Sequence, residues 1–147
     1  MNDNSALVTL PGMGVMVLVV VSALALAASI FYFLTLHQTM NAIGEERRPL
    51  AGGLIWLALI PGLGLIWYMI YTLLLSSALR KELAQRQLPG DGGFGISLAL
   101  VILQVLCFIP YINLLAAIPA LALWIAHWVK MAGYRRLLQP AQTALAV

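Results

Sequence analysis

The sequence predicts an all-α integral membrane protein with four transmembrane helices, the second of them kinked at proline and glycine. The first observation is composition: 63% of the 147 residues are hydrophobic and 9% are charged, whereas soluble globular proteins average about 25% charged residues. The second is the placement of charge, because residues 4–44, 49–79 and 92–129 contain no Asp, Glu, Lys or Arg. A charged side chain at the bilayer centre costs roughly 2.5–3.5 kcal/mol, so lipid is the expected solvent of these stretches.

The first expected span covers about residues 11–36. Roughly 20 apolar residues cross the hydrocarbon core as a helix, so this run is long enough to cross once. Its Ala25-Leu26-Ala27 step has the small-x-small form of a signal-peptide cleavage site. No Lys or Arg precedes that step, however, and the apolar run is longer than the core of a typical signal peptide. We therefore expect a span that the protein retains.

The second apolar run, from Leu50 to Leu79, is longer than one straight helix needs to cross the bilayer. It is interrupted by Pro61, Gly62 and Gly64. Proline removes a backbone donor and clashes with the preceding turn, so a kink is expected there, in a span at about residues 57–79. Three arrangements of Leu50–Ile60 stay open: part of a kinked span, an interfacial segment, or a re-entrant segment.

The third apolar run, from Phe94 to Val129, is too long for one span and long enough for two short ones. A proline and an asparagine in the segment from Pro110 to Asn113 favour a turn between them. Spans are therefore expected at about residues 94–109 and 113–133. Together the four spans form one transmembrane domain, residues 1–147.

The basic residues predict an orientation for this four-span arrangement. The N-terminus, the second connector and the C-terminus would share one face of the membrane. That face would hold Arg80, Lys81, Arg86, Lys130, Arg135 and Arg136, whereas the other would hold Arg47 and Arg48. Because Lys and Arg are enriched in cytoplasmic loops, both termini are expected in the cytoplasm.

Two histidines are the obvious candidate ligands for haem or a metal. In the four-span arrangement His37 ends the first span on the outer face, while His127 lies near the inner end of the fourth. About 25 Å of bilayer would then separate them. His127 also lies between Trp124 and Trp128, which is typical of a polar tip at the membrane interface. We expect no cofactor or metal within one chain, and a haem shared between two copies stays open.

Polar side chains inside the expected spans are few. Gln104 and Asn113 are the strongest of them, and His127 is the third candidate for an intramembrane polar contact. Uncharged amides in membrane helices usually hydrogen-bond to a neighbouring helix. The alternative is that Gln104 and Asn113 line a path for a substrate or for water.

Small and aromatic side chains mark candidate surfaces for helix packing or for a partner subunit. Ala23 and Ala27 share one helical face of the first span, with Ser29 close by. Small residues allow helix backbones to approach closely in a membrane. In the second span, Trp56 and Trp67 would lie on nearly the same face of a continuous helix.

Several kinds of function lack their sequence signals. The sequence shows no P-loop, no His/Cys/Asp metal cluster and no Ser/His/Asp set, so we expect no enzyme. No basic face with interleaved aromatic residues indicates nucleic-acid binding. Glu82 and Asp91 are each too isolated for acid–base chemistry, and Ser76 is expected to be solvated at the end of its span.

A segment of the chain resembles a group of small bacterial four-helix membrane proteins of no known activity. The resemblance lies in Trp56-Leu57-Ala58-Leu59-Ile60-Pro61, in Ile66-Trp67 and in the Ser-x-Leu ending near Leu79. It implies a location in the bacterial cytoplasmic (inner) membrane and supports four spans. It brings no activity, cofactor or functional residue with it.

The leading hypothesis for function is a non-catalytic accessory or assembly subunit of a larger membrane complex. Its expected partners are the lipid bilayer and other membrane protein subunits. Two alternatives remain: a homo-oligomeric channel or small transporter, in which Gln104 and Asn113 line the path, and a redox subunit that binds haem or quinone.

Overall fold

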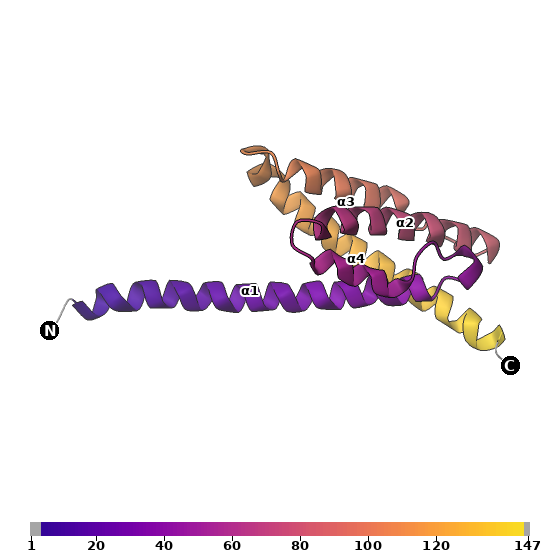
Figure 1. The fold of residues 1–147 in the computed structure, drawn as a ribbon, viewed down its shortest axis with the longest axis horizontal. Helices are drawn as coiled ribbons and strands as arrows, with labels where there is room; N and C mark the ends of the chain where they lie inside the picture. Colours follow the sequence, from indigo (N-terminus) through magenta and orange to yellow (C-terminus); the bar gives the residue numbers. More distant parts are fainter. Residues whose placement is uncertain (1–3, 146–147) are drawn as a thin grey trace. The chain divides into compact units, whose positions relative to one another are not determined.

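Helices are the only regular secondary structure in the described part of the protein. A computed structural model describes residues 4–145, with side chains described from Met13 to Gln139. In chain order the elements are α1 (Asn4–Asn41), η1 (Glu45–Arg47), η2 (Gly52–Leu59), α2 (Gly64–Gln85), α3 (Phe94–Leu106) and α4 (Ile112–Leu145) (Figure 1). The described residues contain no strand, so the predicted all-α class is confirmed.

Two of these helices are long and apolar enough to cross a membrane. They are Met13–Asn41 of α1 and Ile112–Gln139 of α4. Helix α3 is apolar but shorter, with 13 residues, and at 1.5 Å per residue it is about 20 Å long. Length and composition therefore give weak support to a membrane location, and they do not show four spans.

The chain divides into two compact units, one ending at Tyr32 and the other beginning at Phe33. The first unit is the single helix that forms most of α1. Its side chains from Met13 to Val21 are apolar apart from one glycine, and the large ones are 51–70% exposed. A helix that is apolar on every side needs lipid or another protein around it.

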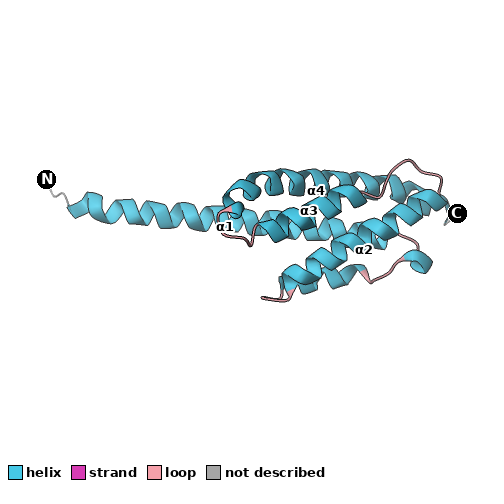
Figure 2. Ribbon diagram, turned by 90° about the horizontal axis from the view of Figure 1, so that it is seen from above, coloured by secondary structure: helices cyan, strands magenta, loops and turns pink. Residues whose placement is uncertain are grey.

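In the second unit, the interruption at Pro61 is a reversal of the chain. Residues 61–63 form a turn, in which Gly62 has a φ of +86°, and η2 then lies antiparallel against α2 (Figure 2). The Trp67 indole N–H donates to the carbonyl of Leu54 at 2.6 Å, and the Tyr71 hydroxyl donates to the carbonyl of Gly52 at 3.1 Å. The kinked span expected at 57–79 is therefore replaced by a helical hairpin.

Glycine makes this reversal possible. A Cβ atom on Gly64 would lie 2.1 Å from the carbonyl oxygen of Ala58, well inside any tolerated contact. The last turn of η2 can therefore lie against the first turn of α2 only because that position has no side chain. Ile55 of η2 becomes fully buried, and Trp56 packs edge-on against Phe33 with ring centroids 6.3 Å apart.

Helices α3 and α4 form a second antiparallel hairpin. The turn between them contains Tyr111, which has a positive φ of 69°, near the turn expected at Pro110–Asn113. The helices differ from the expected spans at two ends, because α3 stops at Leu106 and α4 continues to Leu145. Neither this turn nor the one at residues 60–63 contains a charged side chain.

The core of the second unit lies between the last turns of α1 and helices α2, α3 and α4. Its largest fully buried apolar side chains include Leu36, Met40, Tyr71, Leu75, Leu79, Leu83, Leu100, Met131 and Leu138. Polar residues are buried among them: Thr35, Thr39, Thr72, Ser76, Glu82, Ser97 and His127. Because buried polar groups need hydrogen-bond partners, the contacts of these residues define the candidate functional site.

Candidate functional site

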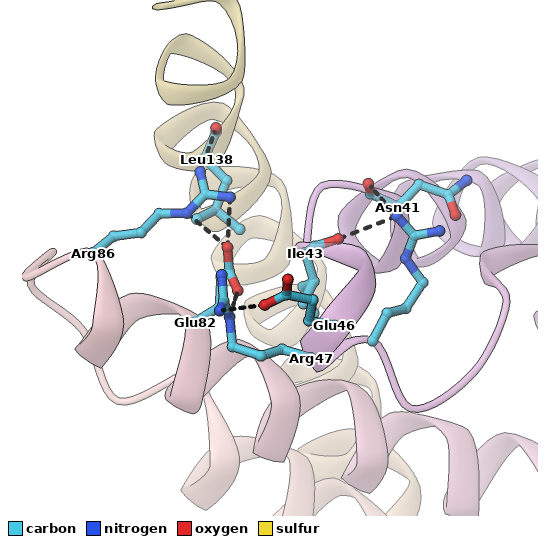
Figure 3. A network of polar contacts seen from close by, with 8 residues as sticks. Asn41, Ile43, Glu46, Arg47, Glu82, Arg86 and Leu138 are labelled. Carbon is cyan, nitrogen blue, oxygen red and sulfur yellow. Dashed lines mark hydrogen bonds and ion pairs between the residues drawn. The ribbon is translucent and has the colours of Figure 1, made fainter. Parts of the chain in front are cut away.

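A buried carboxylate flanked by two arginines joins three elements of the second unit. Glu82 of α2 has a fully buried side chain, and its two carboxylate oxygens face different guanidinium groups (Figure 3). Arg47 of η1 donates from Nε to Oε2 at 2.5 Å, and Arg86 donates from Nε to Oε1 at 2.6 Å. Arg86 also donates from Nη1 to the carbonyl of Leu138 in α4 at 3.2 Å. The triad therefore ties η1, α2 and α4 together.

The electrostatics of the triad favour an ionised Glu82. Burial raises the pKa of Glu82, but the hydrogen bonds from Arg47 and Arg86 outweigh burial, so the net pKa lies below its ordinary value of 4.5. The same contact with Glu82 raises the pKa of Arg47. Removing a charge from water is costly unless it is paired and hydrogen-bonded, and here both conditions are met.

A second ion pair connects the α2–α3 loop to α4. Asp91 Oδ1 accepts from Lys130 Nζ at 2.8 Å and from the Tyr134 hydroxyl at 2.7 Å. It also accepts from the backbone N–H of Gly93 at 3.0 Å, immediately before α3 begins. These hydrogen bonds, the one from Lys130 first, hold the pKa of Asp91 far below its ordinary value of 3.8.

Beside these pairs lies a fully buried Ser–Ser–His cluster that links α2, α3 and α4. Ser97 Oγ of α3 lies 2.9 Å from Nε2 of His127 and contacts Ser76 Oγ of α2. Both serine hydroxyls also donate to carbonyls four residues earlier, Ser76 to Thr72 within α2 at 2.8 Å and Ser97 to Gly93, just before α3, at 2.9 Å. Each of the three side chains is 0% exposed.

The last turns of α1 pack against α4 between Trp128 and Arg135. The Trp128 indole N–H donates to Thr35 Oγ1 at 2.9 Å, and Thr39 Oγ1 lies 3.4 Å from the carbonyl of Met131. Arg135 hydrogen-bonds to Gln38.

We call the part of the second unit formed by residues 41–48, 80–93 and 130–138 the charged end. It contains all eight Lys and Arg residues.

This arrangement contradicts the expected distribution of charge between two membrane faces. Arg47 and Arg48 were expected opposite to Arg80–Arg86, yet Arg47 contacts Glu82 directly. The reason is the hairpin, because η2 and α2 run in opposite directions and bring the chain back to where α1 ended. The expectation that both termini are cytoplasmic rested on the number of Lys and Arg residues assigned to each face, so it loses this support.

The expected separation of the two histidines is also wrong. His37 lies on α1 between Thr35 and Thr39, whose contacts with Trp128 and Met131 place it at the same end of the unit as His127. His127 is fully buried beside Ser97, so it is not an exposed interfacial tip. Among the described residues, no group of three or more His, Cys, Asp or Glu residues could hold a metal ion.

The other predicted site residues are not among those that form the charged end. Ala23, Ala27 and Ser29 belong to the first unit, where the Ser29 hydroxyl donates to the carbonyl of Ala25 at 2.8 Å. Trp56 and Trp67 lie on opposite arms of the η2–α2 hairpin, because one continuous helix does not form there. Asn113 is exposed, and Oε1 of Gln104 is buried without a hydrogen-bond partner.

Sequence reasoning missed the residues that form the charged end. Glu82 and Asp91 looked isolated, and Ser76 looked solvated, because their partners are distant in the chain. One local signal was available: Glu82 and Arg86 have the i,i+4 spacing of a helical ion pair. Arg47, 35 residues from Glu82, left no comparable signal.

The Ser–Ser–His cluster is closed to solvent. Ser97 and His127 have the spacing of a nucleophile and its base, but both are fully buried, and none of the described surface pockets is lined by either residue. Their geometry serves packing, since each hydroxyl and the imidazole contacts a hydrogen-bond partner within the cluster.

The chain matches no protein-family model, and neither a curated protein nor a solved structure is measurably similar to it.

Proposed function

We propose that the chain is a non-catalytic accessory or assembly subunit of a larger complex in the bacterial cytoplasmic membrane. Its location is supported by Met13–Asn41 and Ile112–Gln139, which are long and apolar enough to cross, and by the uncharged stretches between its charged residues. The bacterial address follows from the resemblance of Gly53–Arg80 to small bacterial membrane proteins.

The contacts of the charged end support a topology for this proposal. Helix α1 crosses once, whereas the η2–α2 and α3–α4 hairpins enter from one face and return to it. The 3₁₀ helix η2 has 8 residues and at about 2 Å per residue reaches only about 16 Å, half of the hydrocarbon core. Because Lys and Arg favour the cytoplasm, the charged end is cytoplasmic.

The observation that carries the accessory role is the first unit. Its apolar helix has no second helix in its own unit to cover it, and Ala23 and Ala27 give it one face of small residues. Membrane helices associate through such faces because lipid tails provide no hydrophobic drive for contact. The polar groups of the second unit, by contrast, are largely satisfied by one another. The partner expected at the Ala23–Ala27 face is a transmembrane helix of another subunit.

A matched pair of leucine substitutions tests this role. Ala27→Leu places a large side chain on the small-residue face, whereas Ala25→Leu makes the same substitution about 160° away from that face around the helix. After purification of the full chain in mild detergent, Ala27→Leu should reduce the co-purified membrane partner several-fold and Ala25→Leu should not. Recovery of the same partner with both variants, or of the chain alone from wild-type membranes, would contradict the proposal.

One observation favours a second candidate, a homo-oligomeric channel or small transporter. Oε1 of Gln104 is buried without a hydrogen-bond partner, and an unsatisfied amide in a membrane helix has a reason when it faces a solute path. Flux through liposomes that contain only this chain, reduced by Gln104→Leu, would favour the channel over the accessory subunit.

A further inference from the structure

A surface pocket at the charged end is lined by two cations. Its volume is about 420 Å³, and its lining consists of Ser77, Arg80, Lys81 and Ala84 of α2 together with Phe94 of α3. The helical residues recur at intervals of three and four, so they share one face of α2. The pocket therefore combines two positive charges, a hydroxyl, a methyl group and an aromatic ring, with no carboxylate.

The close approach of the α2–α3 loop to α2 builds the pocket. Gly92 lies against the last turns of α2, where a Cβ atom would be 2.5 Å from the backbone nitrogen of Arg80 and 2.6 Å from the carbonyl oxygen of Ser76. Gly92 also has a φ of +67°, which favours glycine. This contact fixes the start of α3, and with it Phe94, beside Arg80 and Lys81.

The two cations of this pocket are not neutralised by the protein. In the described part of the chain, Glu82 pairs with Arg47 and Arg86, Asp91 pairs with Lys130, and neither Arg80 nor Lys81 forms an ion pair. Glu82 follows them directly in sequence but is buried in the triad. Two adjacent exposed cations without a counter-ion favour an external anion.

The position of the pocket along α2 indicates the chemistry of that anion. The uncharged stretch of α2 ends at Leu79, and Arg80 and Lys81 are its first charged residues. In the proposed topology this is the depth of the lipid headgroups on the cytoplasmic face, where basic residues attract anionic lipids. Phe94, at the start of α3, provides apolar contact for the glycerol and the first acyl carbons of such a lipid.

We propose that this pocket binds the phosphate headgroup of an anionic phospholipid, with Arg80 and Lys81 holding the phosphate oxygens and Ser77 donating a hydrogen bond. Arginine and lysine both bind phosphate, and charge-assisted bonds of this kind are strong. The proposal rests on the membrane location given under the proposed function, but it does not depend on the accessory role.

Lipid titration of the purified full chain in mild detergent tests the site. Phosphatidylglycerol and phosphatidylcholine are added in turn, and bound lipid is counted by native mass spectrometry. Arg80→Gln/Lys81→Gln should weaken phosphatidylglycerol binding by about 30-fold, given the usual contribution of a basic residue near an anionic headgroup. The matched control Arg135→Gln/Arg136→Gln removes the same charge from the same end and should change binding less than about threefold, because those residues do not line the pocket.

A second pair of variants leaves every charge in place. Ala84→Phe fills the pocket and should weaken phosphatidylglycerol binding, whereas Gln85→Phe, one residue further along α2, should not. Equal weakening in both double variants would show diffuse attraction to the charged end and overturn the proposal. Equal binding of phosphatidylcholine would also overturn it.

Inorganic phosphate separates the two possible sources of the anion. An excess of inorganic phosphate should not displace phosphatidylglycerol, because the lipid also binds through its glycerol and acyl carbons. Displacement would assign the pocket to free phosphate. A chain that stays monodisperse without any amphiphile would instead refute the membrane location, so the two failures are distinguishable.

Discussion

At the scale of single residues, Glu82 is the most informative side chain of the second unit. It is the only described acidic residue with a fully buried side chain, and it is satisfied by Arg47 and Arg86 together. Removing one member of a buried ion pair leaves the others unpaired, which costs more than the pair itself contributes. The stability of the second unit therefore depends on Glu82 far more than on the exposed acids of η1.

Neutralising Glu82 should destabilise the protein strongly. For Glu82→Gln we expect a loss of about 2–3 kcal/mol, at or below the lower end of the range for a fully buried pair, because Arg47 and Arg86 retain access to water. Glu45→Gln, an exposed residue of η1, should change stability by less than about 0.5 kcal/mol. Thermal unfolding in detergent measures both variants, and equal stability for the two would refute the role of the triad.

The lowered pKa of Glu82 predicts how the stability of the protein depends on pH. Because the pKa of Glu82 is lowered by folding, its contribution is fully present above its ordinary value of 4.5 and is lost as pH falls through the lower pKa of the folded state. The difference in melting temperature between wild type and Glu82→Gln should therefore shrink as pH falls below 4.5. A difference that grows in acid would contradict this sign.

At the scale of elements, the η2–α2 hairpin is the feature that the sequence left open. The break at Pro61, Gly62 and Gly64 could be predicted, because proline and glycine interrupt helices through local sterics. The direction of the chain after the break could not, since a kinked span and a folded-back arm are equally apolar. What decides it is non-local: Trp67 and Tyr71 donate to carbonyls of η2.

The hairpin should be sensitive to a single methyl group at its turn. In Gly64→Ala the new Cβ atom would overlap the backbone of Ala58, and backbone cannot move aside as a side chain can. We expect a loss of about 2 kcal/mol or more, typical of overpacking. Gly53→Ala is the control, because its Cβ atom would meet no atom within 4 Å. Equal melting temperatures for the two variants would show that η2 does not pack on α2.

At the scale of the whole molecule, all eight Lys and Arg residues lie in the charged end, although they were expected on two faces of a membrane. Composition was sufficient to predict an all-α chain, and α3 and α4 begin within one residue of the expected spans. The side on which Arg47 lies could not be predicted, because counting charges requires the number of reversals to be known first. Its contact with Glu82 changes the expected topology from alternating loops to loops on one side.

Cysteine labelling distinguishes these two topologies. In a Cys107→Ala background, which removes the single native cysteine, Glu45→Cys and Gln87→Cys provide one exposed site on each connector. A membrane-impermeant maleimide should label both from the same side of sealed vesicles, together with Arg136→Cys. Labelling of Glu45→Cys from the opposite side would restore the four-span arrangement and refute the hairpin.

The uncharged turns at residues 60–63 and 107–111 have a further consequence for how the molecule meets bilayers of different thickness. A loop that carries ions is fixed at the water boundary, because moving it inward requires dehydration of charge. These turns carry none, so a deeper or shallower position changes only the contact of apolar groups with lipid, at a fraction of a kcal/mol per Å of mismatch. In the proposed topology the protein is therefore anchored at one membrane surface by its charged residues, and its uncharged turns can change depth toward the other surface.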